Sequence, residues 1–443
     1  MPSQAHIAAY RGMVLHFLAD PGEGDDSHAM QFFDDGLLVV EDGRVKAVGD
    51  AASLLSSLPR NAQQVDYSGR LILPGFVDAH IHYPQTDVIA SYGMQLLDWL
   101  ERYTYPAEAG FADAEHAREM AEFFLDELLR NGTTTALVFA TVHAQSVDVF
   151  FQSALERNLR MIAGKVLMDR NCPEPLRDTP AQGYRESAAL IEKWMGQGRL
   201  GYAITPRFAV TSSEAQLELA GQLAREHPQA HIQSHMAENR EELARVRELF
   251  PSSRNYVDVY DRFGLLRERA VYAHCIHLDS DERSRMAQMG AAAAACPTSN
   301  LFLGSGLFDF AAARGAGMRV GMGTDVGGGT SFNMLRTLSE GYKVAQLTGQ
   351  RLSPWRAFYL ATLGGARALG LDDHIGNFQP GKEADFAVLR LDSTPLMARR
   401  IRTCSTPAEK LFALMMLGDD RAVAATYVMG QAAHVSPPVA QRK

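Results

Sequence analysis

Cysteine is scarce in this chain, and the four that occur lie far apart. Among 443 residues they are Cys172, Cys275, Cys296 and Cys404, and no two of them form a C-x-x-C pair. Disulfide frameworks are typical of short, cysteine-rich secreted domains, and thiolate zinc sites use closely spaced cysteines. The scarcity therefore argues against both and indicates unpaired thiols in a reducing compartment.

Long apolar runs and clusters of positive charge are also missing. No uncharged apolar stretch approaches the roughly 20 residues of a membrane helix, and the N-terminus lacks the pattern of a signal peptide. The 52 Asp and Glu residues outnumber the 43 Lys and Arg residues, whereas proteins that bind nucleic acids usually present a basic face. We therefore expect a cytoplasmic protein without a nucleic-acid or membrane partner; a free nucleobase, being neutral, is not excluded.

The middle of the chain alternates strand-length apolar runs with helical patterns. The predicted strands are residues 73–81, 133–139, 161–167, 202–209, 231–235, 270–274, 291–295 and 320–324. Eight strands with helical stretches between most of them favour an α/β fold of the closed parallel type, a (β/α)8 TIM barrel. An open doubly wound sheet is the alternative, but it needs a Gly-rich phosphate turn after its first strand, and the sequence PGFVD at residues 74–78 is no such turn.

Both ends of the chain are rich in β-strand patterns. Residues 36–40 and 44–48 flank an acidic-Gly turn, as in a hairpin, and residues 384–389 and 424–430 are again strand and turn material. We therefore predict a small β-sandwich domain that both termini build together, although two unrelated edge hairpins would give the same pattern. The predicted limits are 1–72 and 384–443 for the β-sandwich and 73–383 for the catalytic barrel.

His80 and His82 form the strongest local signal, at the end of the strand sequence GFVDAHIH. Side chains alternate between the two faces of a strand, so both imidazoles point the same way. Each could place a nitrogen about 2.0–2.1 Å from a shared zinc ion. Taken alone, the pair is also compatible with two histidines that only satisfy neighbouring polar groups.

Three further strands end in residues of the same chemical type. His235 ends one strand and Glu238 follows it, His274 ends the next strand, and Asp325 follows the last one. In barrel enzymes the chemistry collects at the C-terminal ends of the strands, so we predict a metal site there. Two readings stay open: Glu238 could be a glutamate that a helix N-terminus stabilises, and His274 could be a core histidine.

This arrangement resembles the amidohydrolase superfamily, specifically its branch of mononuclear nucleobase deaminases, over nearly the whole chain. The resemblance implies a homodimer with one zinc ion per chain, and it implies these ligands: His80, His82, His235 and Asp325. A two-metal site would need a carboxylated lysine on the fourth strand, residues 202–209, which has none. Lys165 lies on the third strand, and we interpret it either as structural or as a residue that contacts a metal ligand without binding the ion.

Hydrolytic deamination requires a nucleophilic water, a proton shuttle and a Lewis acid. Zinc lowers the pKa of bound water from 15.7 to about 7. We expect Asp325 to take the water proton, Glu238 to protonate the ring nitrogen and the leaving amine, and His274 to donate to the hydroxide or the adduct. Such proton transfers typically contribute about 10²–10⁴-fold each. The unrelated cytidine-deaminase signature, P-C-x-x-C, is absent from this sequence.

Three segments narrow the range of possible substrates. They are residues 82–85 (HYPQ), residues 98–108 (DWLERYTYPAE) and residues 205–209 (TPRFA). All three are similar to segments of the guanine deaminases, which implies hydrolysis of guanine to xanthine and ammonia. Arg207 can donate to the ring carbonyl, Gln85 can donate and accept along the ring edge, and Phe208 can cover a ring face. Trp99 is either a wall of the pocket or loop packing. The remaining residues that we expect to contact the substrate are His82, His235, Glu238 and Asp325.

Two other functions fit the sequence less well. A hydrolase of the same branch could act on a triazine, a pterin or an adenosine derivative of the S-adenosylhomocysteine or thiomethyladenosine type. A non-catalytic metal-binding scaffold would belong to a different class, but it would have no use for Glu238.

Overall fold

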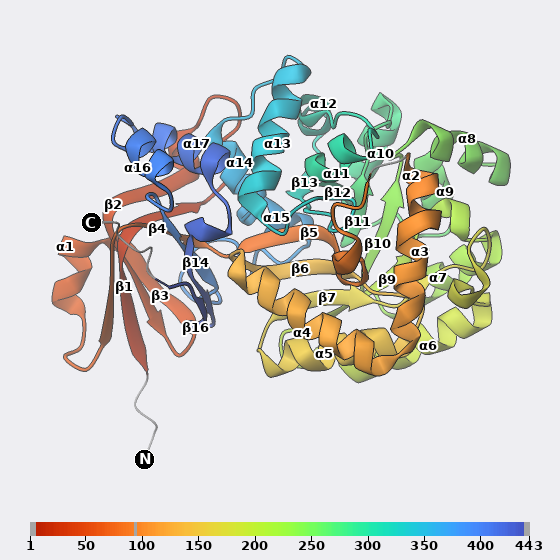
Figure 1. Ribbon diagram of the computed structural model, residues 1–443, viewed down its shortest axis with the longest axis horizontal. Coiled ribbons are helices and arrows are strands. Elements are labelled where there is room, and N and C mark those ends of the chain that lie inside the picture. Colours follow the sequence, from red (N-terminus) through yellow and green to blue (C-terminus); the bar gives the residue numbers. More distant parts are fainter. Residues whose placement is uncertain (1–5, 93–94, 438–443) are drawn as a thin grey trace.

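The computed structural model describes residues 6–92 and 95–437, which form a barrel with a separate sheet at its side (Figure 1). The barrel strands follow one another in chain order: β5 (Phe76–His82), β6 (Thr133–Phe139), β7 (Arg160–Gly164), β9 (Gly201–Pro206), β10 (His231–Met236), β11 (Ala270–His274), β12 (Ala292–Ala295) and β13 (Arg319–Met322). Neighbours along this order are parallel, and β13 lies against β5, so the ring is nearly closed. The predicted barrel is confirmed, and the open doubly wound alternative is wrong.

Helices surround the barrel on the outside (Figure 1). They are α2 (Leu96–Trp99), α3 (Tyr105–Ala109), α4 (Ala114–Arg130), α5 (Ala144–Glu156), α6 (Pro180–Trp194), α7 (Glu214–Glu226), α8 (Arg240–Leu249), α9 (Tyr256–Arg262), α10 (Ser280–Gln288), α11 (Pro297–Phe302), α12 (Phe310–Gly315), α13 (Met334–Leu347), α14 (Pro354–Leu360) and α15 (Leu363–Ala368). In α4, the side chain of Asp113 caps the first turn, and Ala117, Ala121, Phe124 and Leu128 are buried. This spacing of three to four residues gives one apolar face, which packs against the barrel.

The two ends of the chain meet in one sheet of seven strands, drawn in red and blue at the left of Figure 1. Its order is β16 (Gln431–Val435), β15 (Val423–Val428), β14 (Phe386–Arg390), β4 (Gln63–Pro74), β1 (Ile7–Phe17), β2 (Met30–Glu41) and β3 (Arg44–Asp50). β4 and β14, more than 300 residues apart, are antiparallel neighbours, with Leu73 opposite Ala387. The prediction of one β domain from both termini is confirmed, and the alternative of two unrelated hairpins is wrong.

This sheet curls around its own core. Tyr10 of β1 contacts the rings of Phe386 in β14 and Tyr427 in β15, and the turn between β2 and β3 reaches the other end of the sheet, where Gly43 contacts Met429. Asp42 and Gly43 in that turn have φ angles of 48° and 81°, as a two-residue hairpin turn requires. The short helix α1 (Ala51–Leu54) contacts β2 and β3, whereas α17 (Pro407–Leu417) packs against α16 (Pro395–Ile401), α13 and α14. The exact domain limits, after residues 72 and 383, stay a prediction.

Two of the predicted strands are interrupted. The run of residues 73–81 belongs to two sheets, because β4 ends at Pro74 and β5 begins at Phe76. A Cβ atom on Gly75, between them, would lie 2.1 Å from Oγ1 of Thr134, so the close approach of the chains there requires glycine. The run of residues 161–167 is interrupted at Lys165, after which the short strand β8 (Val166–Leu167) pairs with β9.

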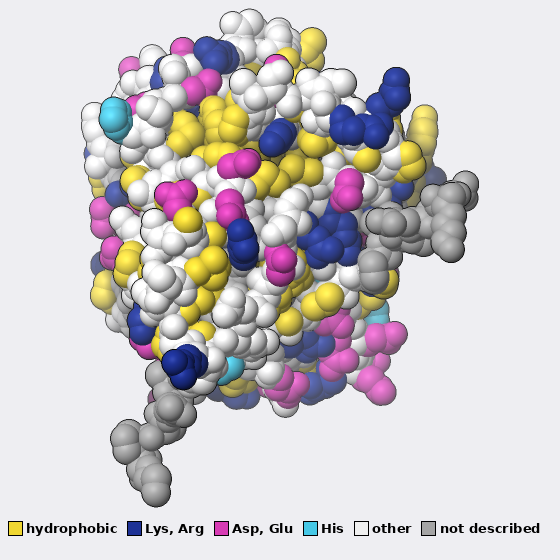
Figure 2. Space-filling model, turned by 90° about the vertical axis from the view of Figure 1, so that its left-hand side faces the viewer, with side chains coloured by type: hydrophobic (Ala, Val, Ile, Leu, Met, Phe, Trp, Pro, Cys, Tyr) yellow, Lys and Arg dark blue, Asp and Glu magenta, His cyan; other side chains and the backbone are white. Residues whose placement is uncertain are grey.

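The surface mixes charges of both signs. Figure 2 looks onto the side of the molecule that carries the terminal sheet, and there Lys and Arg side chains alternate with Asp, Glu and hydrophobic ones. All four cysteines are free thiols. In the part of the chain that the structure describes, no helix has both the length and the apolar character needed to span a bilayer.

Candidate active site

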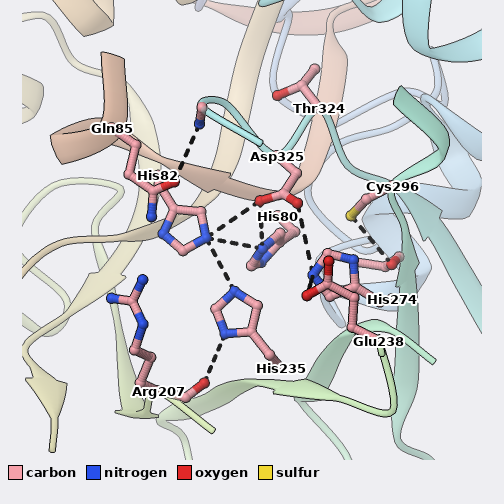
Figure 3. A network of polar contacts seen from close by, with 12 residues as sticks. His80, His82, Gln85, Arg207, His235, Glu238, His274, Cys296, Thr324 and Asp325 are labelled. Carbon is pink, nitrogen blue, oxygen red and sulfur yellow. Dashed lines mark hydrogen bonds and ion pairs between the residues drawn. The ribbon is translucent and has the colours of Figure 1, made fainter. Parts of the chain in front are cut away.

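Four barrel strands deliver histidines and an aspartate to the same mouth of the barrel (Figure 3). His80 and His82 end β5, His235 lies near the end of β10, and His274 is the last residue of β11. β10 and β11 pair with His235 opposite Ala273 and Met236 opposite His274, so the two histidines lie one residue apart in register. Asp325 follows β13, with φ at 53°, and its backbone N–H donates to the carbonyl oxygen of His80 at 2.9 Å.

The four predicted ligand groups converge on one point. Nε2 of His82 lies 3.2 Å from Nε2 of His80 and 3.2 Å from Nε2 of His235. Oδ1 of Asp325 lies 3.1 Å from Nε2 of His80 and 3.4 Å from Nε2 of His82. Ligand atoms bonded to a tetrahedral zinc ion stand roughly 3.3 Å apart. The donor set and its spacing therefore fit a divalent metal ion.

The protonation of these imidazoles also suits a metal. His235 uses Nδ1 to donate to the backbone oxygen of Arg207 at 2.7 Å, which leaves the lone pair of Nε2 facing the cluster. Burial lowers the pKa of His82 to about 3, and burial together with the neighbouring histidines holds the pKa of His235 well below its usual range. Burial alone would raise the pKa of Asp325, but contacts with His80 and His82 hold it well below its usual range. Neutral imidazoles and an ionised carboxylate are the forms that bind metal.

His274 lies at the edge of this cluster. Together with His80, His235 and Asp325 it also offers a ligand atom within 4.8 Å of the others. Its Nε2, however, is 3.7 Å from Oδ2 of Asp325 and 3.3 Å from Oε2 of Glu238, and Nδ1 contacts Oδ1 of Asn300 at 2.9 Å. Since the amide oxygen can only accept, Nδ1 donates to it, and Nε2 faces the two carboxylates and the cluster. His274 is therefore placed to contact reacting atoms as well as a metal.

Glu238 is buried beside His274, in the loop after β10. Burial, with repulsion from Asp325, raises the pKa of Glu238 to about 8, so its carboxyl group carries a proton at neutral pH. The hydroxyl of Ser305 donates to its Oε1 at 2.9 Å. Glu238 precedes the first turn of α8 (Arg240–Leu249), and Asn239 and Glu242 form the capping box of that helix.

A pocket lies next to this cluster, and together with the solvent space at its mouth it encloses about 400 Å³. Gln85 comes from the turn η3 (Tyr83–Val88) after β5, Arg207 and Phe208 come from the end of β9, and Trp99 ends α2. These four side chains are at most 4% exposed. The lining of the pocket includes every residue that we expected to contact the substrate: His82, Gln85, Trp99, Arg207, Phe208, His235, Glu238 and Asp325.

Two buried carboxylates near the site, those of Glu108 and Asp78, have no role that the sequence predicts. Glu108 accepts hydrogen bonds from Arg207 and Gln85, and nothing in the sequence pointed to this contact, since Glu108 and Arg207 are 99 residues apart. Asp78 lies beneath the histidine pair and accepts from Thr324. The sequence could have indicated Asp78, because Asp78, His80 and His82 are spaced by two residues and therefore lie on one face of β5.

Lys165 does not contact the cluster. Its ammonium group pairs with Asp178, and with Oε2 of Glu186 at 3.4 Å. Asp178 lies in the loop between β8 and α6, and Glu186 lies in α6. This agrees with the interpretation of Lys165 as structural.

The chain is similar to known proteins over most of its length. Residues 71–433 match the model of the amidohydrolase family. The guanine deaminase of Escherichia coli (strain K12) is 52% identical over 432 residues, which cover 97% of this chain and 98% of that protein; the human guanine deaminase is 33% identical over 451 residues, 97% of each chain.

Solved structures agree with the sequence relatives. The structure of the E. coli guanine deaminase superposes with a TM-score of 0.95 at 50% identity, covering 97% of this chain and 100% of that one. A guanine deaminase from C. acetobutylicum, solved with guanine bound in its active site, has a TM-score of 0.87 at 28% identity, covering 96% and 100%. The chain belongs to the amidohydrolase family and, within it, to the guanine deaminases.

Proposed function

We propose that this protein hydrolyses guanine to xanthine and ammonia. The observation that carries the proposal is one buried pocket that Gln85, Arg207 and Phe208 line together with His82, His235, Asp325 and Glu238. A flat ring with a carbonyl oxygen matches the first three groups, and the proton-transfer groups lie opposite them. The relatives named guanine deaminase support the same substrate.

The chain's own residues divide the reaction between them. Arg207 donates to the oxygen at C6 of guanine and Phe208 covers a ring face, which presents C2 and its amine to the cluster. Asp325 accepts a proton from the attacking water, and His274 donates to the developing oxyanion. Glu238, protonated at neutral pH, gives its proton to the ring nitrogen. Of the two protons of the attacking water, one leaves with the amine as ammonia and the other restores Glu238. The metal ion supplies a Lewis acid that lowers the pKa of water to about 7.

The same wall of the pocket discriminates against adenine. An adenine ring presents an amine where Arg207 requires an acceptor. A buried guanidinium donor left without a partner costs about 1–3 kcal/mol, so we expect adenine to bind more weakly than guanine.

We further propose that the metal is zinc, one ion per chain, bound by His80, His82, His235 and Asp325. Three imidazoles and one carboxylate are ligands that zinc prefers, and the spacing of their atoms fits a single ion. We also propose a cytoplasmic location, which the sequence suggests, and a homodimer, which the family resemblance implies. Light scattering of the purified protein would test the homodimer.

The decisive experiment follows the conversion of guanine by absorbance and measures the ammonia released. The turnover of a panel of purines, pterins and triazines, each measured with and without a chelator, defines the substrate specificity and the need for a metal. We expect guanine to be the best substrate and the chelator to abolish its turnover. A pterin or triazine turned over faster than guanine would overturn the substrate assignment, and full activity with the chelator would overturn the metal.

A further inference from the structure

We propose that Glu108 is a positioning residue that sets the specificity of the pocket for a ring with a carbonyl oxygen at C6. The inference rests on the proposed function and concerns the same pocket. Glu108 is 0% exposed and lies in α3. It does not line the pocket, so it acts through the two residues that do.

Glu108 binds both polar residues of the substrate wall. Its Oε1 and Oε2 accept from Nη1 of Arg207 at 2.8 and 2.6 Å, and Oε1 also accepts from Nε2 of Gln85 at 3.1 Å. All three side chains are buried. One carboxylate therefore holds two long side chains that would otherwise have several rotamers, which lowers the cost of ordering them when a ligand binds.

The contact between Glu108 and Arg207 determines which N–H groups of Arg207 remain free to bind a substrate. Glu108 uses only Nη1, and among residues 6–92 and 95–437 no hydrogen bond engages Nη2 of this 2%-exposed guanidinium. Burial works against the charge of Arg207, but Glu108 raises its pKa above the ordinary value. A charged donor without a protein partner thus lines the pocket, where a carbonyl oxygen can satisfy it.

The contact also fixes the amide of Gln85. With its Nε2 donating to Glu108, its Oε1 faces the backbone N–H of Gly327 at 3.4 Å. A neutral side chain at position 108 could accept or donate, and the amide could then take either orientation. The donor and acceptor pattern that the ring edge meets therefore depends on the charge of Glu108.

Glu108 further connects the segment that covers the pocket to the barrel. Trp99 and Leu100, at the junction of α2 and the π-helical turn η4 (Leu100–Thr104), line the pocket. The chain then continues directly into α3, where the ring of Tyr105 lies 5.5 Å from the guanidinium carbon of Arg207. Glu108 and Tyr105 together hold Arg207 against this segment.

The test compares Glu108→Gln, Glu108→Asp and the wild type as zinc-loaded enzymes. The control is Glu282→Gln, since Glu282 is another buried glutamate but accepts from the backbone N–H groups of Tyr256 and Val257, outside the pocket. For each variant, KM and kcat are measured with guanine, and the inhibition constant is measured with 2-aminopurine, which lacks the oxygen at C6. Zinc content and the thermal midpoint are recorded in parallel.

We expect Glu108→Gln to raise KM for guanine by about tenfold or more, while the inhibition constant of 2-aminopurine changes less than about twofold. Glu108→Asp should restore part of the guanine affinity, and Glu282→Gln should leave both constants unchanged. Equal losses for both ligands, or an unchanged KM, would overturn the inference. If Glu108→Gln does not fold, Glu108→Asp decides the question. A larger rise in KM for guanine than in the inhibition constant of 2-aminopurine would support the inference, and equal changes would overturn it. A wild-type protein that releases no ammonia from guanine would instead refute the proposed function.

Discussion

The side chain of Thr324 donates a hydrogen bond of 2.5 Å to Oδ2 of Asp78, and this contact joins the first barrel strand to the segment after the last one. Oδ1 of the same carboxylate accepts from the backbone N–H groups of Thr324 at 3.1 Å and of His80 at 3.2 Å. His80 follows Asp78 by two residues, and Asp325 follows Thr324 directly. One buried carboxylate thus holds the backbone beneath two of the proposed metal ligands.

Thr324→Val removes the hydroxyl from this contact and keeps the shape of the side chain. Because Asp78 is fully buried, its Oδ2 would lose its partner, and we expect the free energy of unfolding to fall by about 1–3 kcal/mol. Urea denaturation measures this change. Thr337→Val is the matched control, since Thr337 is equally buried but its hydroxyl has no hydrogen-bond partner in the described part of the chain. Equal midpoints for the two variants would contradict the role of Thr324.

The sequence predicted the barrel because its strands are short, apolar and separated by helical patterns. Residues 133–139 and 270–274 coincide with β6 and β11. The break at Gly75 could not be seen, because apolar residues continue on both sides of it and only the contact with Thr134 shows that the chain changes sheets there. Pairing of β4 with β14 likewise depends on contacts between distant segments.

The position of a residue at the end of a predicted strand was the signal that identified the site residues. His80, His82, His235, His274 and Asp325 all stand at strand ends, which meet at one mouth of a barrel. Glu108 carries no such signal, because its partners Arg207 and Gln85 reach it only when the barrel closes. The sequence therefore predicts groups that the strands position, but it does not predict groups that act through tertiary contacts.

Glu238→Gln should fold and bind its metal but lose most of its turnover. The amide keeps the shape of the side chain and cannot deliver the proton, so we expect kcat to fall by about 10²–10⁴-fold. Steady-state kinetics and elemental analysis measure the two properties. Glu241→Gln, on the exposed side of α8, is the control and should behave as the wild type. A Glu238→Gln variant with full turnover would remove this residue from the mechanism.

Replacing His82 should remove the bound zinc, whereas replacing His274 should remove turnover and leave the zinc in place. His82 is linked to the other ligands by contacts of 3.2–3.4 Å, whereas His274 is 3.7 Å from Asp325. We expect about one zinc per wild-type chain, little zinc in His82→Ala, and near-normal zinc without turnover in His274→Ala. Elemental analysis of dialysed protein measures this. Two ions per chain would require a bridging ligand, and zinc lost equally from both variants would make His274 a ligand.

Arg207→Lys tests the geometry of the substrate wall while keeping its charge. Lysine can still pair with Glu108, but it lacks the planar fork that presents a second nitrogen to the ring. We expect KM for guanine to rise by about tenfold or more with unchanged zinc content. Arg267→Lys, which loses only contacts to the backbone oxygens of Pro228 and Ala230, is the control. Unchanged kinetics in Arg207→Lys would place the recognition of the carbonyl elsewhere.

Two buried histidines outside the site should make the fold sensitive to mild acid. Burial lowers the pKa of His16 and of His231 to about 4, against about 6.5 in the unfolded chain. Between these values the unfolded chain binds protons that the native protein does not, so their contribution to stability is fully present above pH 6.5 and is lost as the pH falls towards 4. Each histidine should cost about 1–2 kcal/mol at pH 5.

The measurement is the free energy of unfolding at pH 7 and at pH 5 for the wild type and for His16→Gln. Glutamine cannot be protonated but can still donate to Gln31, the partner of His16 at 2.8 Å. The difference between the two pH values should therefore shrink in His16→Gln. It should stay at the wild-type value in His28→Gln, because His28 is exposed. A difference that is the same in both variants would mean that His16 does not contribute to the acid sensitivity.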